Sequence, residues 1–144
     1  MTQDKSIYGH ILVPLENSSS DEAILTHIRP LAKLTKAKLT IIHVADGFMA
    51  RNQKRLGESE EMRQDWAYLQ KVEEQFRAEG FEIRAILACG DPADNIMEVV
   101  ERDGVDLIAM SVHGHRFLQD LILGSVSSAI KHRARVPVLL VRAG

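Results

Sequence analysis

The chain has 144 residues, of which 45% are hydrophobic and 26% are charged, and its net charge is -2 at neutral pH. These values are ordinary for a globular domain and do not indicate nucleic acid or an anionic membrane surface as a partner. The only cysteine, Cys89, excludes an internal disulfide and fits a reducing cytoplasm. No apolar run approaches the ~20 residues that span a bilayer, and the polar first residues lack a signal-peptide core. We therefore expect one cytoplasmic domain over residues 1–144.

The first half of the chain predicts two strands, each followed by a helix. Residues 10–13 form an apolar run that ends at Pro14, and residues 39–44 form a second β-rich run. Ser20 is a candidate N-cap for the first helix. The apolar positions at helical spacing in this helix are Ile24, Ile28, Leu31 and Leu34. The second helix has the strongest apolar stripe in the chain, made of Met62, Trp66, Leu69, Val72 and Phe76.

The second half predicts three more strands, at residues 81–88, 107–110 and 136–141. Polar residues alternate in the first of these, which is typical of a less buried strand. Pro92 and Gly104 mark the beginning and end of a helix between the first and second of these strands. Another helix with an apolar face at Val126, Ala129 and Ile130 precedes the last strand.

Strands and helices therefore alternate regularly along the chain, which predicts a parallel sheet covered by helices on both faces. This fold class is a three-layer, Rossmann-like α/β sandwich. Such sheets bind ligands beyond the carboxyl ends of their strands, where the strand order reverses. Two long loops follow strands in this chain, at residues 14–20 and 111–124, and both line one crevice if those strands are neighbours.

The segment from Asp106 to Ser127 carries the main functional hypothesis. After an apolar strand, the Ser-Val-His-Gly sequence that ends at Gly114 is typical of a tight loop, and Gly124-Ser125 then opens a helix. Glycines allow backbone N–H groups to approach a ligand closely, and a helix N-terminus attracts anions. The pattern predicts a cradle for a nucleotide phosphate, although the glycines could simply punctuate the elements and Ser125 could be only an N-cap.

The remaining motifs give weaker indications. No nucleophile elbow, paired carboxylates or P-loop is present, so we assign no catalytic residue. His113, His115 and His132 suggest a metal site, but His113 and His115 have no cysteine or third fixed ligand close in sequence, and we expect no metal site. His115 and Arg116 could donate to phosphates or form a solvated loop pair. We interpret His43 as a hydrogen-bonded core histidine.

At this point the residues resemble the universal stress protein family. Its nucleotide-binding members carry Gly, two residues, Gly, nine residues, Gly, then Ser or Thr. This chain has that spacing in Ser111, Gly114, Gly124 and Ser125, with serine in place of the first glycine. Similar sequences also occur at residues 41–44, 90–92, 106–108 and 137–141, so the resemblance covers nearly the whole chain.

The resemblance implies a five-stranded sheet in the order 3-2-1-4-5, a homodimer formed through the last strand, and a site for ATP or AMP, with or without Mg²⁺. It places Gly114, Gly124 and Ser125 at the phosphates, with Ser111 at the first position of the pattern, and Val126 and Ser127 near phosphate or ribose. It also places Pro14 and Glu16 near the nucleoside and Leu39 beside the adenine through its backbone. His115 and Arg116 complete the predicted nucleotide-binding residues.

Two residues depart from the family pattern. If the position of Ser111 requires a positive φ, its side chain weakens binding, whereas a hydroxyl directed at the phosphate would help. Glu16 stands where ATP-binding members usually have aspartate. The leading hypothesis is an adenine-nucleotide-binding stress-response module that is dimeric. The alternatives are a dimeric interaction protein that binds no nucleotide and a slow ATPase.

Overall fold

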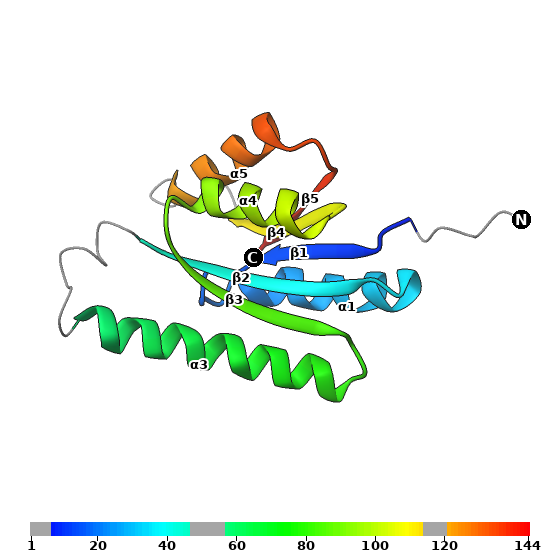
Figure 1. Ribbon diagram of the computed structural model, residues 1–144, viewed down its shortest axis with the longest axis horizontal. Helices are drawn as coiled ribbons and strands as arrows, with labels where there is room; N and C mark the ends of the chain where they lie inside the picture. The colour runs from blue at the N-terminus through cyan, green and yellow to red at the C-terminus, as the bar shows by residue number, and fades with distance from the viewer. Residues whose placement is uncertain (1–6, 47–56, 114–120) are drawn as a thin grey trace, which may run out of the picture.

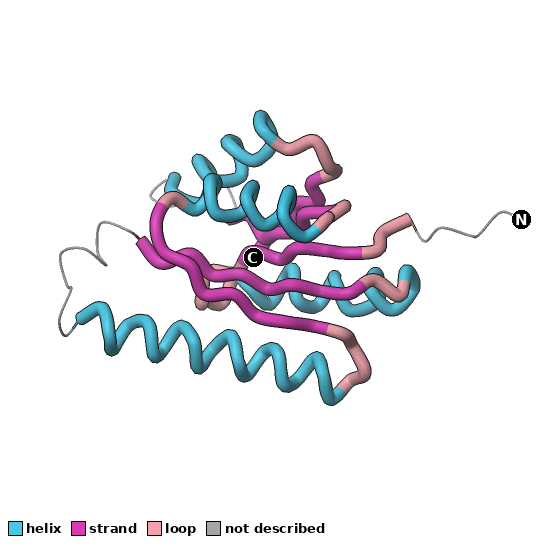
Figure 2. The backbone as a smooth tube through the Cα atoms, in the orientation of Figure 1, coloured by secondary structure: helices cyan, strands magenta, loops and turns pink. Residues whose placement is uncertain are grey.

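The computed structural model describes residues 7–46, 57–113 and 121–144, in which strands and helices alternate along the chain (Figure 1, Figure 2). The strands are β1 (His10–Pro14), β2 (Lys38–Asp46), β3 (Ile83–Gly90), β4 (Leu107–His113) and β5 (Val138–Ala143). The helices are α1 (Asp21–Thr35), α3 (Gly57–Ala78), α4 (Pro92–Asp103) and α5 (Leu121–Arg133). Within the described ranges, no helix is both long enough and apolar enough to cross a lipid bilayer.

The strands form one parallel sheet in the order β3-β2-β1-β4-β5. The predicted α/β fold and its strand order are therefore confirmed. The order reverses at β1, which pairs with β2 on one side and with β4 on the other. The loops that leave the carboxyl ends of β1 and β4 consequently begin side by side, at the place where open α/β sheets bind their ligands.

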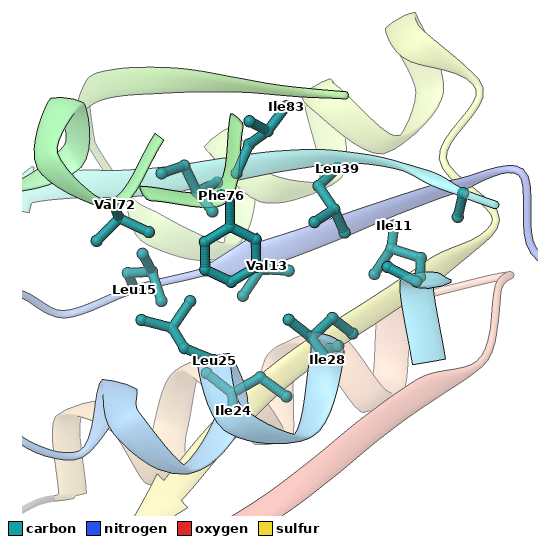
Figure 3. Close-up of a cluster of buried hydrophobic side chains, with 14 of the residues drawn as sticks. Ile11, Val13, Leu15, Ile24, Leu25, Ile28, Leu39, Val72, Phe76 and Ile83 are labelled. Carbon is teal, nitrogen blue, oxygen red and sulfur yellow. The ribbon is translucent and has the colours of Figure 1, made fainter. Parts of the chain in front are cut away.

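Helices cover both faces of the sheet, with α1 and α3 on one face and α4 and α5 on the other (Figure 1). Successive strand residues point to opposite faces, so Ile11 and Val13 of β1 pack under α1 and α3, whereas Leu12 packs under α4 and α5. Figure 3 shows Ile24 and Ile28 of α1 and Val72 and Phe76 of α3 among the buried side chains on the α1 and α3 face of the sheet. Each face of the sheet thus has its own apolar layer.

The ends of α4 follow the sequence prediction. The Asp91 carboxylate accepts a hydrogen bond of 2.8 Å from the backbone N–H of Asp94, and Pro92 occupies the first turn. Gly104 follows the last turn with a φ of 67°, a left-handed conformation that glycine adopts without strain.

The exposed side of α1 differs from the prediction at Leu34, whose side chain is 82% exposed. The buried residues of this helix include Ile24, Ile28 and Ala32. At 100° per residue, Leu34 lies about 120° around the helix from Ile28, and therefore points away from the sheet. Trp66 of α3 is also 38% exposed, at the border of the stripe rather than inside it.

Two predicted boundaries near the proposed phosphate loop are wrong. β4 continues to His113, so Ser111 belongs to the strand rather than to a loop. α5 begins at Leu121, three residues before Gly124, so Ser125 is not its N-cap. Gly124 and Ser125 lie in the first two turns of the helix, and the side chains of residues 121–125 fall outside the described part of the chain.

Candidate functional site

A cavity of about 200 Å³ lies at the carboxyl ends of the strands, where the strand order reverses. Sites for drug-sized ligands usually measure roughly 300–1,000 Å³, so the described residues enclose room for a base-sized group. One wall is apolar and consists of Ile42, Val44, Pro92, Ile96, Met110 and Val126. The opposite side carries the polar residues Glu16, Asp21, His43 and Ser111.

The loop between β1 and α1 is organised by the Asp21 carboxylate. Asp21 is 2% exposed and accepts backbone hydrogen bonds from Glu16 and Asn17, both at 2.9 Å, and from Ser18 at 3.4 Å. Tyr68 of α3 donates a further hydrogen bond of 2.7 Å from its hydroxyl. Burial raises the pKa of the Asp21 carboxyl, and these four donors oppose that rise. The loop donors are therefore directed at an internal carboxylate.

Glu16 is held at the rim of the cavity by two serine hydroxyls. Ser20 donates to Glu16 Oε2 at 2.5 Å, and Ser18 donates to the same oxygen at 3.2 Å. Ser20 occupies the N-cap position of α1 but makes no side-chain cap hydrogen bond. The serine hydroxyls of this loop therefore orient a carboxylate instead of capping the helix.

Ser111 connects β4 to the first turns of α1. Its Oγ accepts a hydrogen bond of 3.1 Å from the backbone N–H of Ile24, and the residue is 5% exposed. It is absent from the described non-glycine residues with positive φ, which are Asn17 and Lys36. The position therefore requires no glycine conformation. The Ser111 Oγ accepts this hydrogen bond with one lone pair, and its O–H group can still donate a second hydrogen bond.

His43 joins three segments of the polar wall. Its Nδ1 lies 2.9 Å from the carbonyl oxygen of Leu15, and its Nε2 lies 3.2 Å from Asp65 Oδ2 on α3. The other oxygen of Asp65 accepts a hydrogen bond of 3.0 Å from the Asn17 side chain. The prediction of a hydrogen-bonded histidine is confirmed, but the ring lines the cavity rather than lying in the core.

The structure gathers four of the predicted nucleotide-binding residues around the cavity, namely Pro14, Glu16, Ser111 and Val126. Ser127 is 6% exposed and follows Val126 on α5. Gly114, His115 and Arg116 lie outside the described residues, as does the side chain of Ser125.

Leu39 is far from this cavity. It is the second residue of β2 and pairs with Ile11 and Ile83 at the amino ends of their strands. Because all strands are parallel, the cavity at their carboxyl ends meets the other end of β2, where Val44 lines the apolar wall. Leu39 therefore does not line this cavity, whereas Val44 does.

The sequence analysis did not identify Asp21, Asp65 and Tyr68, whose hydrogen bonds hold the β1–α1 loop beside the cavity. The signal was present in part, because Asp65 and Tyr68 are polar residues three positions apart, close to the apolar stripe of a helix. Their partners lie 47 and 48 positions away in the chain. Within the ranges that the structure describes, no group of three or more His, Cys, Asp or Glu side chains could hold a metal ion.

Comparison with known proteins identifies the family of this chain. The model of the universal stress protein family matches residues 7–142. The chain belongs to the universal stress protein family. The curated universal stress protein MJ0577 of Methanocaldococcus jannaschii is 24% identical over 155 residues, which cover 94% of this chain and 96% of that protein.

Solved structures of universal stress proteins have the same fold. The MJ0577 structure matches with a TM-score of 0.77 and 26% identity, over 96% of this chain and 98% of that chain. A universal stress protein in complex with cAMP matches with a TM-score of 0.71 and 21% identity, over 95% and 98%. An Archaeoglobus fulgidus protein in complex with dAMP matches with a TM-score of 0.70 and 22% identity, over 94% and 98%.

Proposed function

We propose that this universal stress protein binds an adenine nucleotide, ATP or AMP, in the cavity at the carboxyl ends of β1, β2 and β4. The observation that carries the proposal is the cavity itself, which has an apolar wall on one side and polar groups on the other. The apolar wall, which includes Val44 and Ile96, suits the flat face of a base, since ligand sites combine apolar walls with a few placed polar groups. The cAMP and dAMP complexes of two proteins of this fold support the choice of an adenine nucleotide.

We assign the ribose and the phosphates from the hydrogen-bonding capacity of the nearby protein groups. The Glu16 carboxylate at the rim can accept hydrogen bonds from ribose hydroxyls. The N–H groups of residues 16–18 already serve Asp21, so the β1–α1 loop offers few donors to phosphate. We therefore assign the phosphates to the segment from Gly114 to Ser125, with or without Mg²⁺, as the glycine spacing predicts.

Isothermal titration with Mg-ATP and with AMP tests this function, after a denatured portion of the protein has been analysed for co-purified nucleotide. Val44→Trp should weaken binding by about tenfold or more, because overfilling a preformed cavity costs roughly 1–3 kcal/mol. Leu34→Trp adds the same ring at an 82% exposed position on α1 and is the matched control. Equal affinity of the two variants would contradict the assignment of the base to this cavity.

The second candidate is a dimeric interaction module in the cytoplasm that needs no nucleotide. It is favoured by the Asp21 network, which satisfies the β1–α1 loop without a ligand. In both candidates we propose a homodimer through β5, which stands at the edge of the sheet with half-buried apolar residues. An edge strand offers unpaired backbone groups to a second copy.

Sedimentation velocity with and without ATP separates the two candidates. A dimer that forms equally well in nucleotide-free protein, together with no heat of binding at millimolar ATP, supports the interaction module. A dimer equilibrium that shifts with ATP supports a nucleotide-operated module, since a ligand shifts an equilibrium only through different affinities for the two states.

A further inference from the structure

The hydroxyl of Ser111 uses only part of its hydrogen-bonding capacity within the protein. Its Oγ accepts from the Ile24 backbone N–H at 3.1 Å, and the residue lines the cavity although it is 95% buried. A serine hydroxyl also carries one proton that it can donate. Among the residues that the structure describes, none accepts a hydrogen bond from this hydroxyl. Because a buried donor without an acceptor is costly, the O–H group is a donor for a water molecule or for a ligand in the cavity.

The start of α1 polarises this donor. Ile24 is the fourth residue of the helix, within the first turn, where the backbone N–H groups carry a partial positive charge. The N–H that donates to Oγ increases the polarity of the O–H bond, because consecutive hydrogen bonds strengthen one another. Such a donor suits a negatively charged oxygen best, since hydrogen bonds to ionised acceptors are stronger than those between neutral groups.

The other polar side chains of the cavity do not offer such a donor. Glu16 and Asp21 present carboxylates, which only accept hydrogen bonds when they are ionised. Both ring nitrogens of His43 already lie within 3.2 Å of oxygen atoms of the protein. Among the described side chains that line the cavity, the Ser111 hydroxyl is therefore the donor that remains for a ligand.

The position of Ser111 in the sheet indicates which part of a nucleotide it meets. Ser111 lies on β4, two residues before the strand ends at His113, and the segment to which we assign the phosphates follows that strand. Val44 of the apolar wall lies on β2, and β1 separates β2 from β4. Two strand spacings place β2 and β4 roughly 10 Å apart. A nucleotide that crosses β1 with its base at Val44 therefore brings its phosphate end toward Ser111.

We propose that Ser111 is a specificity-determining residue of the site, whose O–H group donates to a phosphate oxygen of the nucleotide while its Oγ accepts from Ile24. The inference rests on the proposed function and adds to it the group that distinguishes a nucleotide from a nucleoside. The serine that replaces the first glycine of the family pattern supplies a donor that glycine lacks. Through this residue the protein selects phosphorylated nucleosides over unphosphorylated ones.

Isothermal titration of AMP and of adenosine, each with the wild-type protein and with Ser111→Ala, tests the proposal. The two ligands differ only in the phosphate, so a hydrogen bond to phosphate affects only one of them. Ser111→Ala should weaken AMP binding by about tenfold or more, the effect of losing one hydrogen bond to a charged group. Its affinity for adenosine should change by less than about twofold. Ser128→Ala removes an exposed hydroxyl of α5 and is the control, with both affinities unchanged.

Ser111→Cys replaces the alanine variant if that variant does not fold, because a thiol has a similar shape to the hydroxyl but is a weak donor. It should show the same selective loss of AMP affinity. Equal losses for AMP and adenosine, or no loss for either, would overturn the proposal and leave the proposed function standing, with the hydroxyl serving only the contact with α1. A wild-type protein that binds neither ligand would refute the proposed function and this inference together.

Discussion

Replacement of Ser111 by alanine removes one buried hydrogen bond between β4 and α1. The variant removes the Oγ that accepts from the Ile24 N–H at 3.1 Å. Ser111 is 5% exposed and Ile24 is 0% exposed, so water cannot easily replace the lost acceptor. A buried donor without a partner costs about 1–3 kcal/mol. We therefore expect the free energy of unfolding to fall by about 2 kcal/mol.

Ser111→Gly should be more damaging, although it restores the glycine of the family pattern. It removes the same acceptor and adds the entropic cost of glycine inside a strand, about 0.5–1 kcal/mol. The backbone gains nothing in return, because Ser111 has no positive φ to relieve. The serine at this position thus stabilises the fold.

Urea denaturation followed by circular dichroism measures these differences, and thermal melting provides a second estimate. For 144 residues, 1 kcal/mol corresponds to about 3–4 °C, so Ser111→Ala should lower the melting temperature by about 6–8 °C. Ser128→Ala on the exposed side of α5 is the control and should stay within about 0.5 kcal/mol of wild type. A Ser111→Ala protein as stable as this control would refute the assigned role of the hydrogen bond.

Three further predictions concern other parts of the fold. Burial lowers the pKa of His10, and its Nε2 lies 2.7 Å from the Thr40 hydroxyl, so the neutral ring stabilises the fold above about pH 6.5 and this contribution is lost as the pH falls. His10→Gln should flatten the acid side of a stability–pH profile from urea titrations, and an unchanged slope would contradict this. Phe76→Ala removes a buried ring whose centroid lies 5.3 Å from that of Phe81, and it should lower the free energy of unfolding by about 3–5 kcal/mol in calorimetry. A decrease below about 1 kcal/mol would contradict this, because it would mean that neighbouring side chains fill the space of the ring. Asp91→Ala should cost about 1 kcal/mol and Asp91→Ser should recover most of it, because only the cap acceptor differs.

His10 and His43 show how the same residue type differs between the two ends of the sheet. The His10 ring can donate from Nδ1 to the Asp103 carbonyl oxygen and accept at Nε2 from Thr40, so one ring proton satisfies both contacts. The His43 ring instead lies between two oxygen atoms, the Leu15 carbonyl oxygen and Asp65 Oδ2. The difference between the two rings follows from the chemistry of one neighbour each, a hydroxyl or a carboxylate.

Much of the candidate site could be predicted from sequence because it depends on where strands end. Pro14 follows an apolar run, and Ser111 follows another, so both were placed at the carboxyl end of a parallel sheet. Glu16 and Val126 belong to the chain segments that begin or return there. Their common position in the cavity follows from topology alone.

The prediction for Leu39 departs from this topology, because Leu39 lies at the other end of its strand. Apolar periodicity shows that a strand is buried, but nearly every residue of a buried parallel strand is apolar. The pattern therefore does not distinguish the amino end at Leu39 from the carboxyl end at Val44. Leu34 was misplaced for a similar reason, since helical spacing permits more than one face and only packing against the sheet selects the buried one.

The sequence by itself determined the alternation of strands and helices, the parallel sheet and the end of that sheet at which the candidate site lies, because these follow from local periodicity and chain connectivity. Only the tertiary structure decided what the polar residues do. Ser111 accepts from Ile24 across 87 positions, and Asp65 meets Asn17 across 48. Hydrogen bonds require a match of a few tenths of an ångström between atoms, and that match depends on how α1 and α3 rotate and dock on the sheet. No local pattern in the chain encodes that rotation, so the network around Asp21 and His43 emerges only when the helices are packed.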